Sequence, residues 1–170
     1  TIALLKDENA DIKDTLIAPD FAGGGIILYD ESDIDGVYNT GRGSIKVRSK
    51  WNYVKEDNVI EITEIPPTTT VEAIIDKVAD LVKQGKIKEI NDVRDETDLN
   101  GLKLTFDLKR GQDPEKFMRK LFRSTPLEDN FSANFNILIG GSPRVMGIRE
   151  ILTEWTAYRM GCVKRRLYFD

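Results

Sequence analysis

The chain contains no histidine among its 170 residues. Histidine is the usual general base near neutral pH and the commonest metal ligand of proteins. Nucleophilic pairs such as Ser-His and Cys-His also depend on it. Its absence argues against catalysis within this segment and against a metal site built on imidazoles.

Cysteine and long apolar runs are scarce as well. Cys162 is the single cysteine, so a disulfide framework within the chain is excluded. It lies on the same helical face as Trp155 and Tyr158, which indicates packing rather than reactivity. No apolar run approaches the roughly 18 residues that a membrane span needs. We therefore expect a cytoplasmic protein with no targeting segment and no membrane partner.

Charged residues are abundant and nearly balanced. The chain has 25 Lys and Arg residues and 29 Asp and Glu residues, for a net charge of -4. This sum argues weakly against nucleic-acid binding, but the segregation of charge matters more than its average. A hydrophobic content of 40% suffices for one globular domain with a core. Because the chain starts at Thr1 without methionine and stops within a helical pattern, we expect a piece of a longer protein.

A strand with one basic face is expected over residues 44–53. Apolar residues alternate there with Lys46, Arg48 and Lys50, which places the three cations together on the opposite face. After a polar turn, residues 59–65 are expected to return as the second strand of a hairpin. The expected register pairs Trp51 with Ile62, Tyr53 with Ile60 and Lys50 with Thr63.

The segment from residue 59 to residue 139 shows the order strand, helix, strand, strand, helix, strand. Its first helix is expected between a cap at Thr69 and a closing Gly85, and its second begins at Asp113-Pro114. This order is that of a split βαβ, or ferredoxin-like, unit. The fold class is therefore α+β, a βαββαβ unit with an additional N-terminal β-hairpin region and a C-terminal amphipathic helix after Gly140-Gly141.

Three short motifs fail their chemical tests. The acidic run 30–36 resembles a calcium loop, but Arg42 would occupy the position of the bidentate glutamate, so a solvated turn is expected. The glycines at 23–25 lack the Gly-Lys-Ser/Thr of a phosphate-binding loop, so a flexible connection is expected there. An RNA-binding sheet would need exposed aromatic residues, whereas Phe106 is on the apolar face of its strand.

One motif retains a binding interpretation. The turn Gly41-Arg42-Gly43 is suited to offer backbone N–H groups and a guanidinium to a phosphate, and the basic strand after it extends the positive surface. The alternative is an ordinary turn before a solvated strand face. Ile26 and Ile27, taken alone, are expected to be buried strand residues.

Five blocks of sequence follow one another at the spacing of a known family. They are PDF at 19–21, the isoleucines at 26–27 behind three glycines, YNTGRG at 38–43, EIP at 64–66 and RDETD at 94–98 with Gly101. With these blocks the chain resembles the A subunit of bacterial type IIA topoisomerases, DNA gyrase or topoisomerase IV. The resemblance covers essentially all 170 residues. At its end, REILTEWTAYR followed by KRR resembles the family's exit into a long coiled coil.

The resemblance implies the tower domain of that subunit, spanning residues 1–170. Residues 1–57 would be the DNA-facing segment with the basic strand, 58–140 the βαββαβ unit, and 141–170 the exit helix. The catalytic tyrosine of the family lies upstream of Thr1, so this fragment is expected to be inactive alone. The whole enzyme would break and rejoin double-stranded DNA in an ATP-dependent reaction.

The resemblance also implies partners and a DNA site. The partners are double-stranded DNA, the topoisomerase B subunit, and a second A subunit in a homodimer. The fragment itself is expected to bind no cofactor, since Mg²⁺ and ATP are implied for the full enzyme through the B subunit. Ile26 matches an isoleucine that wedges between base pairs and bends the gate segment of DNA. The implied DNA-binding residues are Ile26, Arg42, Gly43, Lys46, Arg48 and Lys50.

The chain departs from the family in two places. It has Ala22-Gly23 where the family usually has Pro-Thr, which predicts a more flexible wedge loop. It has acidic residues at 30–31 where the family often carries basic ones. A non-catalytic α+β protein-interaction module is the alternative from another class, and it predicts a buried Ile26 and scattered charges.

Overall fold

The computed structural model describes residues 1–169, which form two compact units. One unit combines residues 20–28 and 46–131, and the other combines 1–19, 29–45 and 132 onward. Two of the four boundaries along the chain fall inside strands, one in β2 (Arg42–Arg48) and one in β7 (Glu128–Asn134). Each unit therefore joins segments that are distant in the sequence, a division that the sequence pattern does not reveal.

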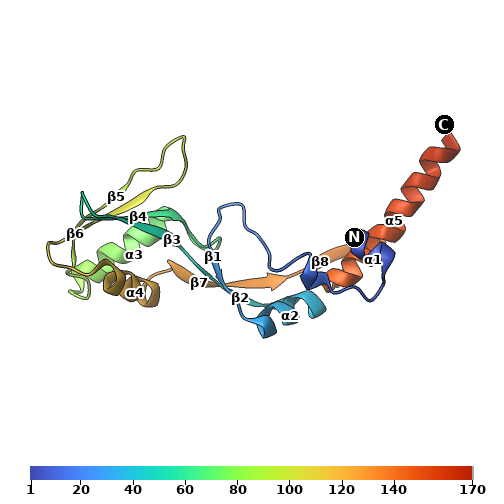
Figure 1. Ribbon diagram of the computed structural model, residues 1–170, viewed down its shortest axis with the longest axis horizontal. Helices are drawn as coiled ribbons and strands as arrows, with labels where there is room; N and C mark the ends of the chain where they lie inside the picture. Colours follow the sequence, from blue (N-terminus) through green and yellow to red (C-terminus); the bar gives the residue numbers. More distant parts are fainter. Residues whose placement is uncertain (170) are drawn as a thin grey trace. The chain divides into compact units, whose positions relative to one another are not determined.

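The first unit is built on a four-stranded antiparallel sheet. In spatial order its strands are β3 (Lys50–Val54), β4 (Val59–Glu64), β6 (Leu104–Leu108) and β5 (Ile90–Asp95). The helices α3 (Val71–Lys83) and α4 (Pro114–Ser124) lie along one face of this sheet (Figure 1). Mixed helices and antiparallel sheets confirm the predicted α+β class.

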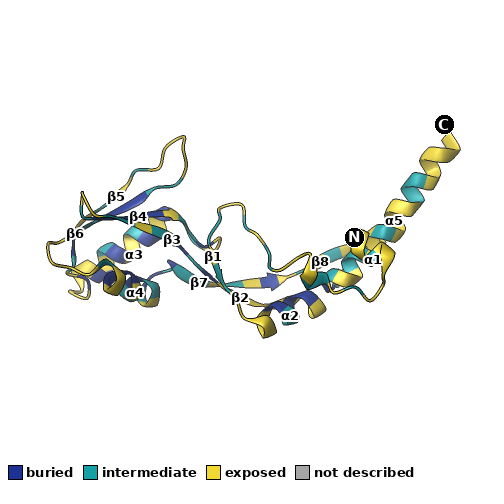
Figure 2. Cartoon of the chain, in the orientation of Figure 1, coloured by how far each residue is buried: buried dark blue, intermediate teal, exposed yellow. Residues whose placement is uncertain are grey.

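The core of this unit lies between the sheet and the two helices (Figure 2). Strand residues Ile60 and Phe106 are fully buried, as are Ile74 of α3 and Leu121 of α4. Apolar residues at every second strand position and every third or fourth helix position reach the same layer. Burial of each such side chain contributes about 1.5–3 kcal/mol. The ring of Phe106 meets that of Phe117 edge-on, with centroids 6.2 Å apart.

The split βαβ arrangement is confirmed for three strands of the predicted unit. Helix α3 connects β4 to β5 along the chain, and β6 lies between these two strands in the sheet, as in a ferredoxin-like unit. The predicted fourth strand is the exception, because β7 belongs to a sheet of order β1-β2-β7. Strand β3 occupies the position beside β4 instead. A short hairpin costs little loop-closure entropy, and it brings Trp51 and Tyr53 onto the core.

The helix ends follow the sequence signals closely. Asp113 caps α4 as predicted, since its side chain accepts hydrogen bonds from the backbone N–H groups of Glu115 and Lys116. The cap of α3 is Thr70 rather than Thr69, and its hydroxyl accepts from Ala73 N at 3.3 Å. The predicted strand over 87–94 begins only at β5, because Ile87 is buried in the turn that follows α3.

The second unit contains three helical segments that precede its long C-terminal helix. They are α1 (Ile2–Lys6), the short 3₁₀ helix η1 (Ile12–Asp14) and α2 (Glu31–Thr40). Helix α2 corrects the expectation of a solvated turn at 30–36. Asp30 caps it by accepting from the backbone N–H groups of Ser32 and Asp33, and its inner face buries Ile34 and Val37.

The C-terminal part of this unit is a hairpin followed by a helix. The expected strand over 131–139 is interrupted at Phe135, and its second half is β8 (Asn136–Ile139), which pairs with β9 (Ser142–Val145). Gly140 and Gly141 form the two-residue turn, with φ of +56° and +81° as a type I′ turn requires. Helix α5 (Ile148–Phe169) is present as predicted, but none of its described residues is buried. No helix within residues 1–169 is long and apolar enough to cross a membrane.

Candidate nucleic-acid interface

The glycine loop at 23–25 is anchored at both ends and is not the flexible connection that the sequence suggested. Phe21 packs edge-on against Phe131, with ring centroids 4.8 Å apart. At the other end the backbone N–H of Gly25 donates to Glu64 Oε2 at 2.6 Å. Gly24 has φ of +73°, and a Cβ there would lie only 2.3 Å from the same carboxylate oxygen. The positive φ favours glycine at this position, and a larger residue would also displace the Glu64 carboxylate.

Strand β1 (Ile26–Leu28) leaves this loop and pairs antiparallel with β2. Ile26 lies opposite Arg48, and 44% of its surface is exposed. A large apolar side chain thus faces solvent beside a guanidinium, contrary to the expectation of a buried strand residue. The interaction-module hypothesis also requires a buried Ile26, so this exposure counts against it.

The single strand predicted over residues 44–53 is wrong, because β2 ends at Arg48 and β3 begins at Lys50 in a different sheet. Lys50 therefore lies on another strand than Lys46 and Arg48. Within β2 the predicted alternation of faces is confirmed. Ile45 and Val47 are buried, whereas Lys46 is exposed and makes no ion pair with any described residue. Arg48 differs from Lys46, since its guanidinium lies 2.5 Å from Glu128 and 4.5 Å above the Phe122 ring. Of Lys46, Arg48 and Lys50, Lys46 is therefore the cation that has no carboxylate partner among the described residues.

Lys50 corrects the predicted register. Trp51 pairs with Ile62 and Tyr53 with Ile60 as expected, but an irregularity between Lys50 and Trp51 shifts Lys50 opposite Glu64 instead of Thr63. The Lys50 ammonium lies 3.0 Å from Glu64 Oε1. A phosphate at Lys50 must therefore compete with a carboxylate.

Glu64 contacts the glycine loop with one carboxylate oxygen and Lys50 of β3 with the other. The N–H of Gly25 and the ammonium of Lys50 lower the pKa of this carboxyl below its ordinary value. In the sequence, Glu64 stands out only as part of the EIP block, with no role of its own. The signal that could have identified Glu64 is its position at the end of β4, two residues after the buried Ile62.

The predicted Gly41-Arg42-Gly43 turn is instead the end of α2 at Gly41 and the start of β2 at Arg42 and Gly43, all in the other unit. Gly41 ends α2 with φ of +73°, and its N–H donates to Val37 O at 2.8 Å. The N–H of Arg42 donates to Thr40 Oγ1 at 3.2 Å. A Cβ at Gly43 would lie 2.6 Å from Val37 Cγ2. The N–H groups of Gly41 and Arg42, which were expected to bind phosphate, are thus already hydrogen-bonded. The exposed side chain of Arg42 is the group that a ligand can contact.

The RDETD block forms an ion-pair network on the sheet of the first unit. Arg94 lies 2.5 Å from Asp107 and 3.1 Å from Glu96, while Lys103 bridges Glu96 and Glu61 at 3.2 and 2.9 Å. Hydrogen bonds from Arg94 and Lys103 hold the pKa of Glu96 below its ordinary value. These residues tie β5 to β6 and β4 and account for the block structurally. Among residues 1–169 no three acidic or cysteine side chains are grouped to hold a metal.

The sequence profile of the DNA gyrase/topoisomerase IV A-subunit family matches residues 1–170. The chain belongs to this family. The resemblance inferred from the YNTGRG and RDETD blocks is thereby confirmed.

Relatives within the gyrase/topoisomerase IV A-subunit family support the assignment along the whole chain. The chloroplastic/mitochondrial gyrase A subunit of Arabidopsis thaliana is 37% identical over 98% of the chain. The gyrase A subunit of Borreliella burgdorferi is 35% identical over 99%, and that of Ureaplasma parvum is 37% identical over 95%. The chain spans 18%, 22% and 19% of these proteins, so it corresponds to about a fifth of their length.

Proposed function

We propose that this chain binds and bends the DNA segment that an ATP-dependent type IIA topoisomerase cuts and rejoins. The observation that carries the proposal is the exposed Ile26, held between an anchored glycine loop and a basic strand. Membership of the gyrase/topoisomerase IV A-subunit family supports it.

Ile26 is the proposed wedge. Inserting an apolar side chain between base pairs costs a few kcal/mol of unstacking, and bending 20–30 bp smoothly costs about 1–6 kcal/mol. A wedge can do this only if its backbone resists displacement. The contacts of Gly25 with Glu64 and of Phe21 with Phe131 provide that resistance on the loop leading to Ile26.

Phosphate contacts offset the cost of bending. Lys46 is the primary contact because its ammonium is exposed and unpaired among the described residues. Arg48 and Lys50 contribute less, because each must first exchange a carboxylate partner, Glu128 or Glu64. Arg42 and Gly43 lie in the other unit, where the exposed Arg42 guanidinium is suited to bind a phosphate. Each phosphate that is neutralised adds about 0.9 to the slope of log affinity against log salt.

The remaining machinery of the topoisomerase lies outside this chain. We infer that a second A subunit together with the B subunits completes the enzyme, with the catalytic tyrosine upstream and with Mg²⁺ and ATP held by the B subunit. No three acidic or cysteine side chains are grouped to hold a metal among residues 1–169, and we assign no step of the reaction to a metal on this chain. The chain alone is therefore expected to bind duplex DNA without cutting it.

Duplex bending by the full A-subunit protein, assembled with the B subunit, tests the proposal. Two fluorophores at the ends of a duplex report bending by energy transfer. Wild type should bring the ends closer, and Ile26→Ala should bind the duplex but leave it straighter. Equal bending by the two proteins would contradict the wedge role, and the absence of any duplex binding would favour the protein-interaction module.

A further inference from the structure

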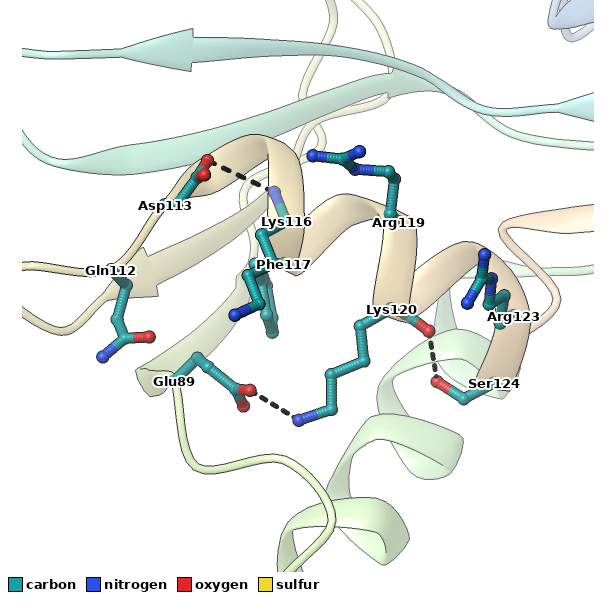
Figure 3. Close-up of a pocket in the computed structure, with 9 residues that line it drawn as sticks. All are labelled: Glu89, Gln112, Asp113, Lys116, Phe117, Arg119, Lys120, Arg123 and Ser124. Carbon is teal, nitrogen blue, oxygen red and sulfur yellow. Dashed lines mark hydrogen bonds and ion pairs between the residues drawn. The ribbon is translucent and has the colours of Figure 1, made fainter.

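Helix α4 separates apolar and basic residues onto opposite faces. Phe117, Met118 and Leu121 are buried in the core. Lys116, Arg119, Lys120 and Arg123, at spacings of three and four residues, form the other face, which we name the α4 basic face. Figure 3 shows their side chains leaving the helix. They line a hollow of about 600 Å³.

The two carboxylates that line this hollow are already engaged. Glu89 lies 2.5 Å from the ammonium of Lys120, and Asp113 accepts the capping hydrogen bonds at the start of α4. Burial raises the pKa of Glu89, but hydrogen bonds from Lys120 and from backbone N–H groups outweigh burial and leave that pKa lowered. Glu89 therefore remains charged and paired with Lys120.

The other three cations of the face lack an acidic partner. Lys116, Arg119 and Arg123 are exposed and form no ion pair within the described part of the chain. The one further contact of the Arg119 side chain is a hydrogen bond from Nε to the Glu115 carbonyl at 3.4 Å. Like charges one helical turn apart destabilise a helix. A chain with a net charge of -4 thus concentrates unpaired positive charge here, which fits a polyanionic ligand.

The α4 basic face adjoins the basic strand within the same unit. The guanidinium of Arg48 lies over the ring of Phe122 at 4.5 Å. Phe122 precedes Arg123 and is one helical turn from Arg119. The stacked pair therefore links Arg48 of β2 to α4. Lys46, Arg48 and α4 all belong to the same compact unit.

We propose that the α4 basic face binds the phosphate backbone of duplex DNA and extends the path that begins at Lys46. Arg119 and Arg123 carry this contact, because a guanidinium matches phosphate geometry and neither has an acidic partner among the described residues. The inference rests on the proposed function, since it assumes that duplex DNA reaches β2. An acidic protein surface is the competing ligand.

Duplex binding by the full A-subunit protein, followed by anisotropy from about 50 to 200 mM salt, tests the proposal. The variant Arg119→Gln/Arg123→Gln removes two charges, and Lys77→Gln removes an exposed, unpaired charge from α3 as the matched control. The double variant should lower the salt slope by about 1.8. Between about 50 and 200 mM salt, its loss of affinity should therefore be about 12-fold smaller than that of wild type. The control should leave the slope near the wild-type value.

The outcomes separate this inference from the proposed function. If wild type binds with a steep slope and Lys46→Gln lowers it, but the double variant does not, the α4 contact is overturned and the β2 contact stands. If the slope is unchanged and the double variant instead weakens assembly with the B subunit, the face is a protein-docking surface and the proposal is wrong. If wild type shows no salt-dependent binding, both proposals fail. Unchanged thermal unfolding of the double variant excludes misfolding as the cause.

Discussion

Glu64 accepts a hydrogen bond from the backbone N–H of Gly25 at 2.6 Å, across 39 positions of sequence. Its second oxygen lies 3.0 Å from the ammonium of Lys50. A single carboxylate thus fixes the loop that precedes the exposed Ile26 and pairs with Lys50 at the start of β3. This relationship makes the glycine triplet an anchored support rather than a slack connection.

Replacing Glu64 should affect both stability and bending. A hydrogen bond to a charged group contributes about 1.5–3 kcal/mol, so Glu64→Ala should lower the free energy of unfolding by an amount of this order. It should also reduce duplex bending, because the loop before Ile26 loses its anchor. Glu61→Ala on the same strand removes only the ion pair with Lys103 and is the control. Denaturant unfolding and end-to-end energy transfer measure the two effects, and full bending by Glu64→Ala would rule out the anchoring role.

The anchor should weaken in acid. The pKa of Glu64 is lowered in the folded state by Gly25 and Lys50, so its stabilisation is fully present above the ordinary carboxyl pKa. It is lost as the pH falls through the lowered folded-state pKa. Unfolding free energies of wild type and Glu64→Gln, measured from pH 7 to about 3, should therefore converge toward the acid end. A gap that stays constant across this range would show that the charge of Glu64 contributes nothing.

Two neighbouring glycines should respond differently to alanine. Gly25 has φ of +111°, and a Cβ there would lie 2.9 Å from Val47 Cγ1. Gly23 has no atom within 4 Å of the corresponding position. Gly25→Ala should cost about 1–3 kcal/mol of backbone strain, whereas Gly23→Ala should be nearly neutral. Thermal unfolding distinguishes them, and equal melting temperatures would contradict the close approach at Gly25.

Ile26→Ala should separate function from stability. Because 44% of Ile26 is exposed, the truncation removes little core and should cost less than about 1 kcal/mol. Ile60→Ala, at a fully buried site of the sheet, should cost about 2–5 kcal/mol. Urea unfolding of both variants provides the comparison. A loss at Ile26 as large as that at Ile60 would identify Ile26 as a core residue and not a wedge.

Local patterns in the sequence predict much of the fold. The alternation around Trp51 and Ile62 fixes a hairpin register that the structure reproduces, and the caps and apolar spacings of α3 and α4 place both helices. Helix α2 is missed because its acidic start reads as a turn, although those acids suit a helix N-terminus. The strand beside β4 is misassigned because strand partners depend on tertiary packing, which no local pattern records.

The candidate site is predicted only in part. Lys46 and Ile26 can be selected from alternation and from the family resemblance. The partners of Arg48 and Lys50 cannot, because Glu128 lies 80 positions away and the irregularity at Lys50 arises from sheet packing. Gly41 and Gly43 suggest phosphate binding in the sequence, whereas in the structure a positive φ and the nearby Met146 backbone explain Gly41, and close packing on Val37 of α2 explains Gly43.

The salt dependence of duplex binding by this chain tests the central claim most directly. Anisotropy titrations from about 50 to 200 mM salt should show binding whose slope falls by about 0.9 in Lys46→Gln. The variant Lys55→Gln, at an exposed and unpaired lysine of the β3–β4 turn, should keep the wild-type slope. The same slope in wild type and Lys46→Gln, or no binding at the low-salt end, would contradict a DNA path along β2.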